Sequence, residues 1–598
     1  MSTIPDKPSL DGLEAKWRRV WADEGTFLFD RTKTRDEIFS IDTPPPTVSG
    51  TLHPGHVCSY THTDTIARYQ RMRGREVFYP MGWDDNGLNV ERRVQLLTGT
   101  RCDPSLPYDP DFRPPEKVSR KDRPIPVSRP NFVELCGAVV EQLEQSYFDL
   151  WSNLGLSVDW SHTYRTIGPE SIRASQRGLL RLVARDLAYR SEEPTLWDVD
   201  FRTAVAQAEL QDREIPGAYY RIRFEGPEAP IWIDTTRPEL IPACVALVAH
   251  PDDERYRPLF GQTARTPLFG VSVPIVAHEL AAPDKGTGIA MICTFGDTTD
   301  VTWWRELGLD LRAVVQRDGR LRPVTWGEPG WESADPASAQ AAYDELAGKT
   351  VKQAQARIVE LLVDAGLMDG DPRPITHPVK FWENGTRPLE IVTSNQWLIR
   401  YPDRDAMLAR GKELAWWPDF MRVRYENWVN GLQGDWNITR QRFFGVPFPA
   451  WYPIDAGGNV DYLAPILADE ASLPVDPTTQ APPGYSDDQR DEPGGFTADP
   501  DVMDTWATSS LTPQIATGWV EDTDLFSRTF PMDLRPQAHD IIRTWLFYTV
   551  VRAHYEHDAL PWANAAISGF IVDPDRKRLS KSAANAPAEP ADLLAMYG

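Results

Sequence analysis

Residues 38–56, IFSIDTPPPTVSGTLHPGH, carry a short apolar stretch, a proline-rich turn and then two histidines beside a glycine. The stretch at about 38–42 is typical of a buried strand, and a helix from about 54 to 73 would end at Gly74. Residues 77–79, Val-Phe-Tyr, indicate a second strand. A strand, a helix and a strand in this order form a right-handed crossover, which places the two strands in parallel. The sequence therefore predicts an α/β fold with a doubly wound, Rossmann-like parallel sheet.

Two imidazoles stand at the predicted start of the first helix, where His53 and His56 flank Gly55. A helix N-terminus favours anions, and imidazoles there can hydrogen-bond phosphate oxygens. A second loop, residues 81–87, contains Asp84 and follows the next strand. Both loops should emerge at the C-terminal ends of the strands, where such sheets bind ligands. Ordinary turn histidines are the alternative, and the position directly after a strand argues against it.

A basic segment near the end of the chain, residues 576–582 (RKRLSKS), is the second candidate for phosphate chemistry. A mobile loop carrying Lys581 could supply positive charge to a bound nucleotide. Most lysine- and serine-rich stretches are only solvated surface loops. We favour the phosphate role for Lys581 because the histidine turn supplies the other half of such a site.

Composition limits the classes of protein that this chain can be. It has 598 residues, a net charge of −24 and five scattered cysteines. The length predicts several domains, and an odd number of dispersed cysteines argues against a disulfide scaffold or a zinc site. No apolar run is long enough to span a bilayer, and no leader is evident at the N-terminus, so we expect no membrane partner and a cytoplasmic location. The acidic total does not exclude RNA, because polyanion binding depends on local basic surface.

The middle of the chain has a different pattern of predicted secondary structure. Residues from about 197 to 321 are rich in short strand patterns and turns, and helical patterns return at about 335–367. Residues 470–500, rich in Pro, Asp and Gly, indicate a solvent-exposed excursion. We therefore predict a catalytic domain interrupted by a β-rich insertion, with the parts at residues 1–205, 206–375 and 376–598.

Taken together, these motifs resemble the class I aminoacyl-tRNA synthetases, and most closely the valyl-tRNA synthetases. Residues 44–56 resemble the family's HIGH region, and residues 578–582 resemble its KMSKS loop. Further similar segments lie between them in the same order: Gly82-Trp83-Asp84, residues 437–442 (NITRQR), residues 501–506 (DVMDTW) and residues 539–543 (HDIIR). The resemblance covers nearly the whole chain and implies a HUP-type catalytic fold.

The resemblance implies ATP-dependent activation of valine, with ATP and Mg²⁺ as a substrate complex and no tightly bound cofactor or resident metal. It assigns the catalytic role to His53, His56 and Lys581. Attack on a phosphorus atom needs positioning and charge stabilisation more than covalent help. The implied ATP ligands are His53, Gly55, His56, Asp540, Ser580, Lys581 and Ser582. The implied amino-acid ligands are Pro45, Pro46, Asp84 and Phe444, with Asp84 binding the ammonium; many relatives have tryptophan at the position of Phe444.

The insertion resembles the family's editing (CP1-type) module. A hydrophobic pocket cannot strongly reject an isostere that adds only a hydroxyl; the valyl enzyme facing threonine is a known example, and a second hydrolytic site is expected. The resemblance implies that Asp300 binds the ammonium of threonyl-tRNA, and that Asp297 or Arg237 contacts the threonine hydroxyl or the terminal adenosine. At bare Asp-x-x-Asp spacing, Asp297 and Asp300 are more often cap residues.

The resemblance also implies tRNA(Val) as a partner and a monomer as the oligomeric state. The family continues past the KMSKS-like loop into an anticodon-binding region, which this chain lacks as far as Gly598. Two other functions stay open from the residues alone. One is a stand-alone enzyme that adenylates an amino acid, and the other is a decayed synthetase that acts as an RNA-binding or regulatory protein.

Overall fold

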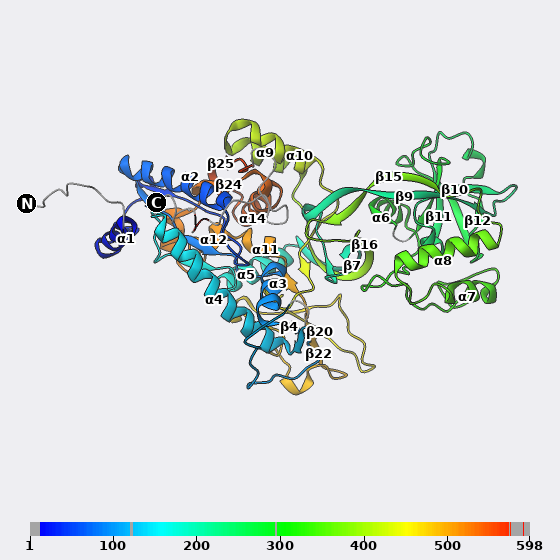
Figure 1. Ribbon diagram of the computed structural model, residues 1–598, viewed down its shortest axis with the longest axis horizontal. Helices are drawn as coiled ribbons and strands as arrows, with labels where there is room; N and C mark the ends of the chain where they lie inside the picture. Colours follow the sequence, from blue (N-terminus) through cyan, green and yellow to red (C-terminus); the bar gives the residue numbers. More distant parts are fainter. Residues whose placement is uncertain are drawn as a thin grey trace, which may run out of the picture. The chain divides into compact units, whose positions relative to one another are not determined.

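The protein is described by a computed structural model that covers residues 12–119, 123–293, 296–572, 575, 590 and 592 (Figure 1). The chain forms two compact units: residues 1–190 with 397–598, and residues 191–396. The second unit is therefore an insertion into the sequence of the first. The predicted domain limits at 205/206 and 375/376 stay a prediction.

A parallel sheet forms the centre of the first unit. Strand β1 (Ile38–Ser40) pairs in parallel with β2 (Glu76–Phe78), with Phe39 opposite Val77. On its other side the chain bridges to β24 (Met532–Ala538) at Ile41 and Leu534, also in parallel. Strand β24 pairs in parallel with β25 (Trp562–Ser568), which in turn pairs in parallel with β17 (Ala415–Trp417). The predicted parallel α/β fold is confirmed.

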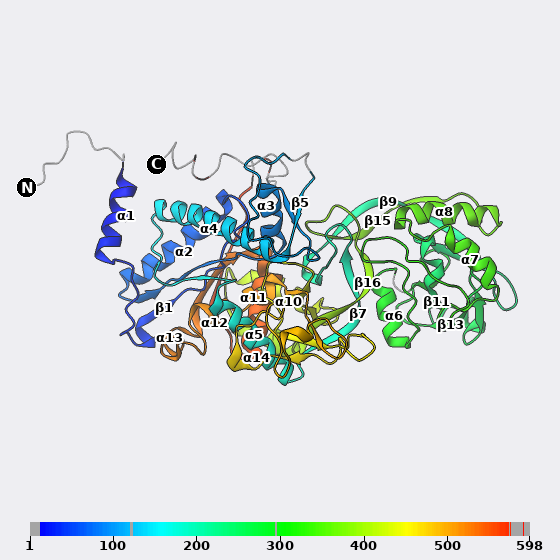
Figure 2. The ribbon, with the colours of Figure 1, turned by 90° about the horizontal axis from the view of Figure 1, so that it is seen from below.

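Helices cover this sheet. Helix α2 (Pro54–Met72) packs on β2 and β24, whereas α13 (Thr523–Thr529) packs on β1 from the other side (Figure 2). The core between sheet and helices is apolar, with Val77, Tyr79 and Trp151 almost fully buried. The other helices of this unit are α1 (Leu13–Glu24), α3 (Leu88–Thr98), α4 (Arg129–Asn153), α5 (Pro169–Ala184), α9 (Arg404–Glu413), α10 (Arg422–Asn430), α11 (Thr505–Ser509), α12 (Thr512–Ala516) and α14 (Phe547–His557).

Short strands extend the first unit outside the main sheet. Strand β3 (Met81–Trp83) runs parallel to β6 (Thr163–Arg165), and β4 (Thr100–Cys102) runs parallel to β5 (Ile125–Val127). The remaining short strands are β18 (Trp436–Asn437), β19 (Thr439–Arg440), β20 (Ala450–Pro453), β21 (Ile466–Leu467), β22 (Phe496–Ala498) and β23 (Val502–Met503).

A buried ion pair joins the N-terminal and C-terminal strands of the main sheet. Arg535 on β24 donates to Asp42 at 2.5 Å, and both side chains are excluded from solvent. The indole N–H of Trp562 on β25 donates to the same carboxylate at 2.8 Å. Charges in an apolar interior are tolerated only when they are paired and hydrogen-bonded, so this contact strongly specifies the neighbouring position of β1 and β24.

The second unit is β-rich, as expected. Its long strands β9 (Leu210–Phe224) and β15 (Arg373–Trp382) pair antiparallel over their length, and β10 (Ile231–Thr235) pairs with β9. A four-stranded sheet follows, in the order β12 (Thr263–Arg265), β13 (Ser272–Ala277), β11 (Cys244–Ala249) and β14 (Ile289–Cys293). The helices of this unit are α6 (Thr298–Leu307), α7 (Pro336–Asp344) and α8 (Val351–Asp364). Strands β7 (Ala188–Asp198) and β16 (Glu390–Ile399) carry the chain across the two boundaries, and β8 (Thr203–Ala204) pairs with β7.

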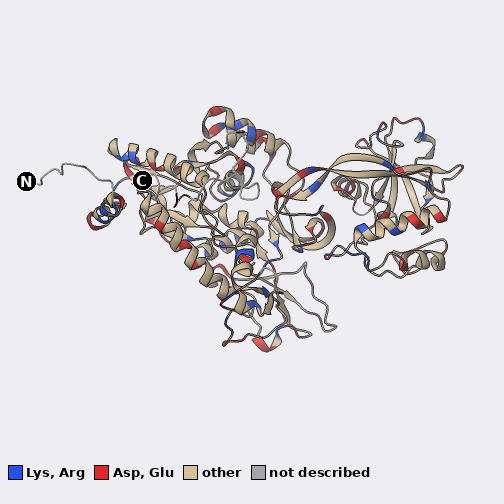
Figure 3. Ribbon diagram, in the orientation of Figure 1, with Lys and Arg blue, Asp and Glu red and all other residues tan. Residues whose placement is uncertain are grey.

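Helix α8 shows how the sequence directs this packing. Ala354, Ile358 and Leu362 repeat every four residues and are fully buried in the core of the second unit. Lys352, Glu360 and Asp364 of the same helix are exposed, and Figure 3 marks its charged positions in colour along the ribbon. This spacing is the one that gives a helix a single apolar face.

The predicted solvent-exposed excursion at residues 470–500 is wrong in part. Leu473, Val475 and Phe496 are buried and pack with Trp451 in a small cluster of their own. None of the helices in the described part of the chain is both long and apolar enough to span a bilayer.

Candidate active site

The histidine turn caps helix α2. His53 is the N-cap residue and has extended backbone angles, and its Nδ1 accepts a hydrogen bond from the Gly55 N–H at 3.1 Å. The backbone N–H of His53 donates to Nδ1 of His56 at 3.3 Å. The two rings lie 3.9 Å apart between centroids. The predicted pair of histidines at a helix start is therefore brought together by reciprocal capping.

This capping fixes which ring nitrogens face outward. Nδ1 of each ring accepts a backbone N–H, so the proton of each neutral imidazole must be on Nε2. The Nε2–H groups of His53 and His56 are therefore the ring donors at the N-terminal end of α2, where the helix dipole is positive. Gly55 is needed for this arrangement, because a Cβ at that position would lie 2.8 Å from Cε1 of the His53 ring.

Asp84 lies in the loop after β3 and is almost fully buried, with 6 % of its surface exposed. Its backbone is tied to the proline turn: the Asp84 N–H donates to the Pro46 carbonyl at 3.1 Å, and the Val48 N–H donates to the Asp84 carbonyl at 2.9 Å. Pro45 and Pro46 are buried as well. The structure thus joins the predicted amino-acid ligands of the two loops directly.

Among the described residues, only two hydroxyl groups contact the oxygens of the buried Asp84 carboxylate. The Thr47 hydroxyl donates to Oδ2 at 2.9 Å, and the Thr166 hydroxyl faces Oδ1 at 3.5 Å. Asp84 forms no ion pair with any residue that the structure describes. Burial raises the pKa of Asp84 to about 7, against the lowering effect of these two hydroxyls. A bound ammonium group would stabilise the charged form.

Phe444 is buried, and a carboxylate that the sequence did not single out holds it in place. Glu91 on α3 accepts the backbone N–H groups of Phe443 at 2.7 Å and of Phe444 at 3.0 Å. The Gly87 N–H donates to the Phe444 carbonyl at 3.2 Å. Phe444 is therefore joined to the loop that carries Asp84.

Asp540 lies just beyond the C-terminal end of β24, in a short 3₁₀ turn, and is partly exposed. This is the end of the sheet at which ligands of such folds bind. Ser580, Lys581 and Ser582 lie outside the described residues. The strand that leads toward them, β25, ends at Ser568, whose hydroxyl is 3.0 Å from that of Ser59 on α2. The end of β25 therefore lies beside the helix that His53 caps.

The editing candidates gather in the second unit. Arg237 pairs with Glu239 at 2.5 Å and with Glu390 at 2.8 Å. Burial opposes the charge of Arg237, but the two carboxylates outweigh it and raise its pKa. Its turn (η3, Pro238–Ala243) packs on β14, which leads to Asp297 and Asp300.

Asp297 and Asp300 are cap residues, the alternative that their spacing allowed. Asp297 accepts the backbone N–H groups of Thr299 at 2.7 Å and Asp300 at 3.1 Å, at the start of α6. Asp300 accepts the N–H of Gly296 at 2.7 Å. Burial and then the Asp297 charge raise the pKa of Asp300 well above its usual value, and Arg237 acts in the opposite direction. Asp300 is thus a buried carboxylate within electrostatic reach of Arg237, which leaves a binding role open besides capping.

Three residues near the site were not singled out from the sequence. The hydroxyls of Thr47 and Thr166 and the carboxylate of Glu91 act on Asp84 and Phe444 across long sequence separations. Only Thr47 carried a usable signal, because it stands inside the proline turn next to the other candidates.

The chain is similar to known proteins over most of its length. A family model described as "tRNA synthetases class I (I, L, M and V)" matches residues 16–106 and 113–598. The solved LeuRS–tRNA–LeuAMS ternary complex of Agrobacterium radiobacter K84 is similar with a TM-score of 0.50 and 18% identity, over 99% of this chain and 71% of that one, which supports the fold alone. Fold and motifs thus define a class I aminoacyl-tRNA synthetase.

Proteins of similar sequence show to which family of this class the chain belongs. The valine–tRNA ligase of Thermobifida fusca is 63% identical over 99% of this chain and 67% of that protein. That of Salinispora tropica is 62% identical over 100% of this chain and 69% of that protein. The chain belongs to the valine–tRNA ligase family. It spans about two thirds of the length of these relatives.

Proposed function

We propose that the chain activates valine with ATP, forms valyl-adenylate and pyrophosphate, and transfers the valyl group to tRNA(Val). Family membership supports this proposal. The observation that carries it is the buried Asp84 carboxylate, which has two hydroxyl neighbours and no cation among the described residues. An amino-acid ammonium supplies the missing charge.

In the proposed reaction the carboxylate oxygen of valine attacks the α-phosphorus of ATP. A new P–O bond forms to the acyl oxygen, and the bond to the β-phosphate oxygen breaks with release of pyrophosphate and its Mg²⁺. Asp84 binds the ammonium, and the Pro45–Pro46 turn with Phe444 surrounds the side chain. The Nε2–H donors of His53 and His56 bind phosphate oxygens, and Lys581 neutralises charge that develops on the leaving group.

Substitution of Lys581 tests the proposed role of the basic loop. We expect Lys581→Ala to lower valine-dependent ATP–pyrophosphate exchange by about 10²- to 10³-fold, the usual cost of removing one group that stabilises transition-state charge. The Kd for valine, measured by calorimetry, should stay unchanged because the proposed role of Lys581 is on the pyrophosphate leaving group.

Lys577→Ala is the matched control, since it removes the same charge from the same segment. An equal loss of exchange in both variants would show that only the overall charge of the segment matters. Normal exchange in Lys581→Ala would refute its assigned role.

We further propose that the second unit hydrolyses mischarged threonyl-tRNA, with Asp300 as the ammonium ligand and Arg237 and Asp297 beside it. The electrostatic proximity of Asp300 and Arg237 supports one site built from two separate sequence motifs. The hydrogen bonds of Asp297 and Asp300 to the backbone give these carboxylates fixed positions.

Asp300→Asn separates binding from capping, because the amide oxygen can still accept the Gly296 N–H. We expect threonyl-tRNA hydrolysis to fall about thirtyfold or more, since removing one partner of a buried charge pair costs about 2 kcal/mol or more. Deacylation of pre-formed threonyl-tRNA measures the loss, and valine exchange should be unchanged.

Asp318→Asn, in an exposed turn of the same unit, is the control. Unimpaired hydrolysis in Asp300→Asn would leave Asp300 with capping alone. Equal loss of hydrolysis and exchange would point to a general structural defect.

The stand-alone adenylating enzyme and the decayed paralogue are not favoured. Identity of 59–63% to valine–tRNA ligases extends over essentially the whole chain and includes the candidate-site region. Pyrophosphate exchange with a panel of amino acids tests this choice, and preference for a non-protein amino acid over valine would reverse it.

A further inference from the structure

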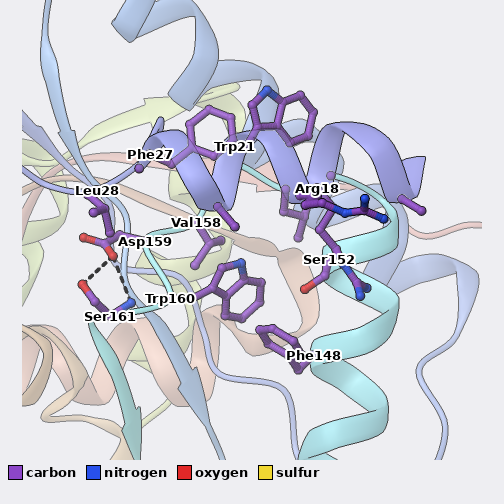
Figure 4. A pocket seen from close by; sticks show the side chains of 16 residues that line it. Arg18, Trp21, Phe27, Leu28, Phe148, Ser152, Val158, Asp159, Trp160 and Ser161 are labelled. Carbon is purple, nitrogen blue, oxygen red and sulfur yellow. Dashed lines mark hydrogen bonds between the residues drawn. The ribbon is translucent and has the colours of Figure 1, made fainter. Parts of the chain in front are cut away.

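The first unit contains a cavity of about 540 Å³ (Figure 4). None of the candidate residues named above lines it. Helix α1, the C-terminal end of α4 and the loop at residues 155–161 surround it. Its volume is within the range of sites that hold a small organic molecule, which is about 300–1,000 Å³. No step of the proposed reaction uses it.

Aromatic rings form much of the wall. Trp21 and Phe27 contact each other at 5.3 Å between centroids, and Phe148 meets Trp160 edge-on at 4.7 Å. All four side chains line the cavity (Figure 4). Flat apolar walls of this kind favour a planar aromatic ligand, which can stack on one ring and meet the edge of another.

One buried polar group of the lining has no partner in the described part of the chain. Ser152 on α4 is 6% exposed, and its hydroxyl makes no hydrogen bond to any described residue. In Figure 4 this hydroxyl extends from α4 toward Trp160. An unsatisfied buried hydroxyl is uncommon in native proteins and calls for a missing acceptor. A ligand oxygen in the cavity would supply it.

The charged side chains of the lining favour an anion. Arg18 and Arg19 are exposed along α1, and Arg18 uses one N–H on Asn153 at 3.1 Å. Asp159 is the one carboxylate of the lining and is already engaged. It accepts from the Phe29 N–H and His162 at 2.9 Å and from Ser161, so burial is outweighed and its pKa falls to about 2. Asp159 is therefore an ionised carboxylate whose oxygens already accept hydrogen bonds, and the charged groups left for a ligand are the two arginines at the rim, Arg18 and Arg19.

We propose that this cavity binds a small planar aromatic carboxylate. The aromatic body lies between the ring walls, a carboxylate oxygen accepts the Ser152 hydroxyl proton, and Arg18 and Arg19 attract the charge from the rim. None of the residues that line the cavity belongs to the candidate active site, so the proposed binding does not depend on the proposed aminoacylation.

Calorimetric titration of the intact chain with 2-naphthoate, and with the neutral 2-naphthamide of the same shape, tests the proposal. A ligand of this size should bind one site with a Kd on the order of 1 mM or below, from the usual free energy per ligand atom. The naphthoate should bind about threefold to tenfold more tightly than the amide, because exposed charge pairs contribute only modestly. Equal binding of the two compounds would overturn the choice of an anion.

Three variants locate the site. Ala22→Trp fills the cavity and should abolish binding, while Ser152→Ala and the double variant Arg18→Gln/Arg19→Gln should each weaken it about threefold or more. Arg73→Gln, an exposed arginine on the C-terminal end of α2, is the control and should bind normally. A far-UV circular dichroism spectrum and a urea midpoint equal to those of the wild type show that each variant is folded.

If Ala22→Trp fails to fold, Ser152→Ala still decides the outcome, since it removes only one oxygen atom. Wild-type affinity in both Ser152→Ala and the double arginine variant would overturn the proposal. No binding of either compound up to their solubility would show the cavity to be only a packing gap between α1 and α4.

Discussion

Asp84→Asn is expected to lower kcat/KM for valine in pyrophosphate exchange by about a hundredfold or more, mainly through KM. The substitution keeps the size of the side chain and the bond from the Thr47 hydroxyl but removes the charge that the proposed ammonium contact needs. Loss of one partner of a desolvated charge pair costs about 3 kcal/mol, which corresponds to a factor of more than one hundred.

The pH dependence of KM gives this prediction a second readout. Burial raises the pKa of Asp84 to about 7, so the carboxylate takes up a proton as the pH falls through that value and loses its attraction for the ammonium. The KM for valine should therefore rise about tenfold per pH unit below about pH 7 and be flat above it. The Asp84→Asn protein should show no such rise.

Asp85→Asn is the matched control. Burial first, and then the carboxylates of Glu144 and Asp84, raise the pKa of Asp85 well above its usual value. The substitution changes a second buried carboxyl group of the same loop and leaves Asp84 in place. An unchanged KM in Asp84→Asn, or a pH profile that persists in it, would contradict the proposed ammonium site.

Arg535→Met should lower the free energy of unfolding of the first unit by about 3–5 kcal/mol, because it leaves the Asp42 carboxylate buried without its charged partner. Among the described residues, the Asp42 carboxylate would retain only the Trp562 N–H at 2.8 Å and the Thr512 hydroxyl at 3.4 Å. The urea midpoint, followed by loss of exchange activity and by tryptophan fluorescence, measures the change.

The double variant Asp42→Asn/Arg535→Met should recover part of this loss, since no unpaired charge remains. Arg528→Met, which breaks an exposed pair with Asp524, is the control and should shift stability by about 1 kcal/mol or less. A small effect of Arg535→Met, equal to that of the control, would show that water or rearrangement compensates Asp42.

The sequence was sufficient for the parts of the fold that local pattern determines. Residues 38–79 combine apolar runs with Pro and Gly punctuation, and the predicted strand, helix and strand match β1, α2 and β2 within about two residues. Strand β3 was taken for a loop, because its three residues become a strand only by pairing with β6. The burial of Leu473 and Phe496 was missed because Pro, Asp and Gly dominate the composition around them.

The candidate site likewise has residues that the sequence indicated and contacts that it did not. His53, Gly55, His56 and Asp84 became candidates because they stand in loops after predicted strands and because those loops resemble motifs of a known family. The hydrogen bonds from Phe443 and Phe444 to Glu91 join positions more than 350 residues apart, and no local pattern encodes them. Asp300 is both a residue of the helix cap and a buried carboxyl group near Arg237. This could not be predicted from the sequence, because it depends on where Gly296 and Arg237 lie in the fold.

The pairing of β1 with β24 has a consequence for synthesis of the chain. Strand β1 is translated early, but its neighbour β24 and the next strand of the sheet, β25, are complete only at Ser568, which is 378 residues after Arg190. At about 5–20 residues per second, the ribosome needs roughly 20 to 75 s for that distance. Residues 222–362, whose core is self-contained, can fold in this interval. The nascent first half meanwhile exposes an unpaired strand edge and is the part of the chain on which chaperone protection should matter most.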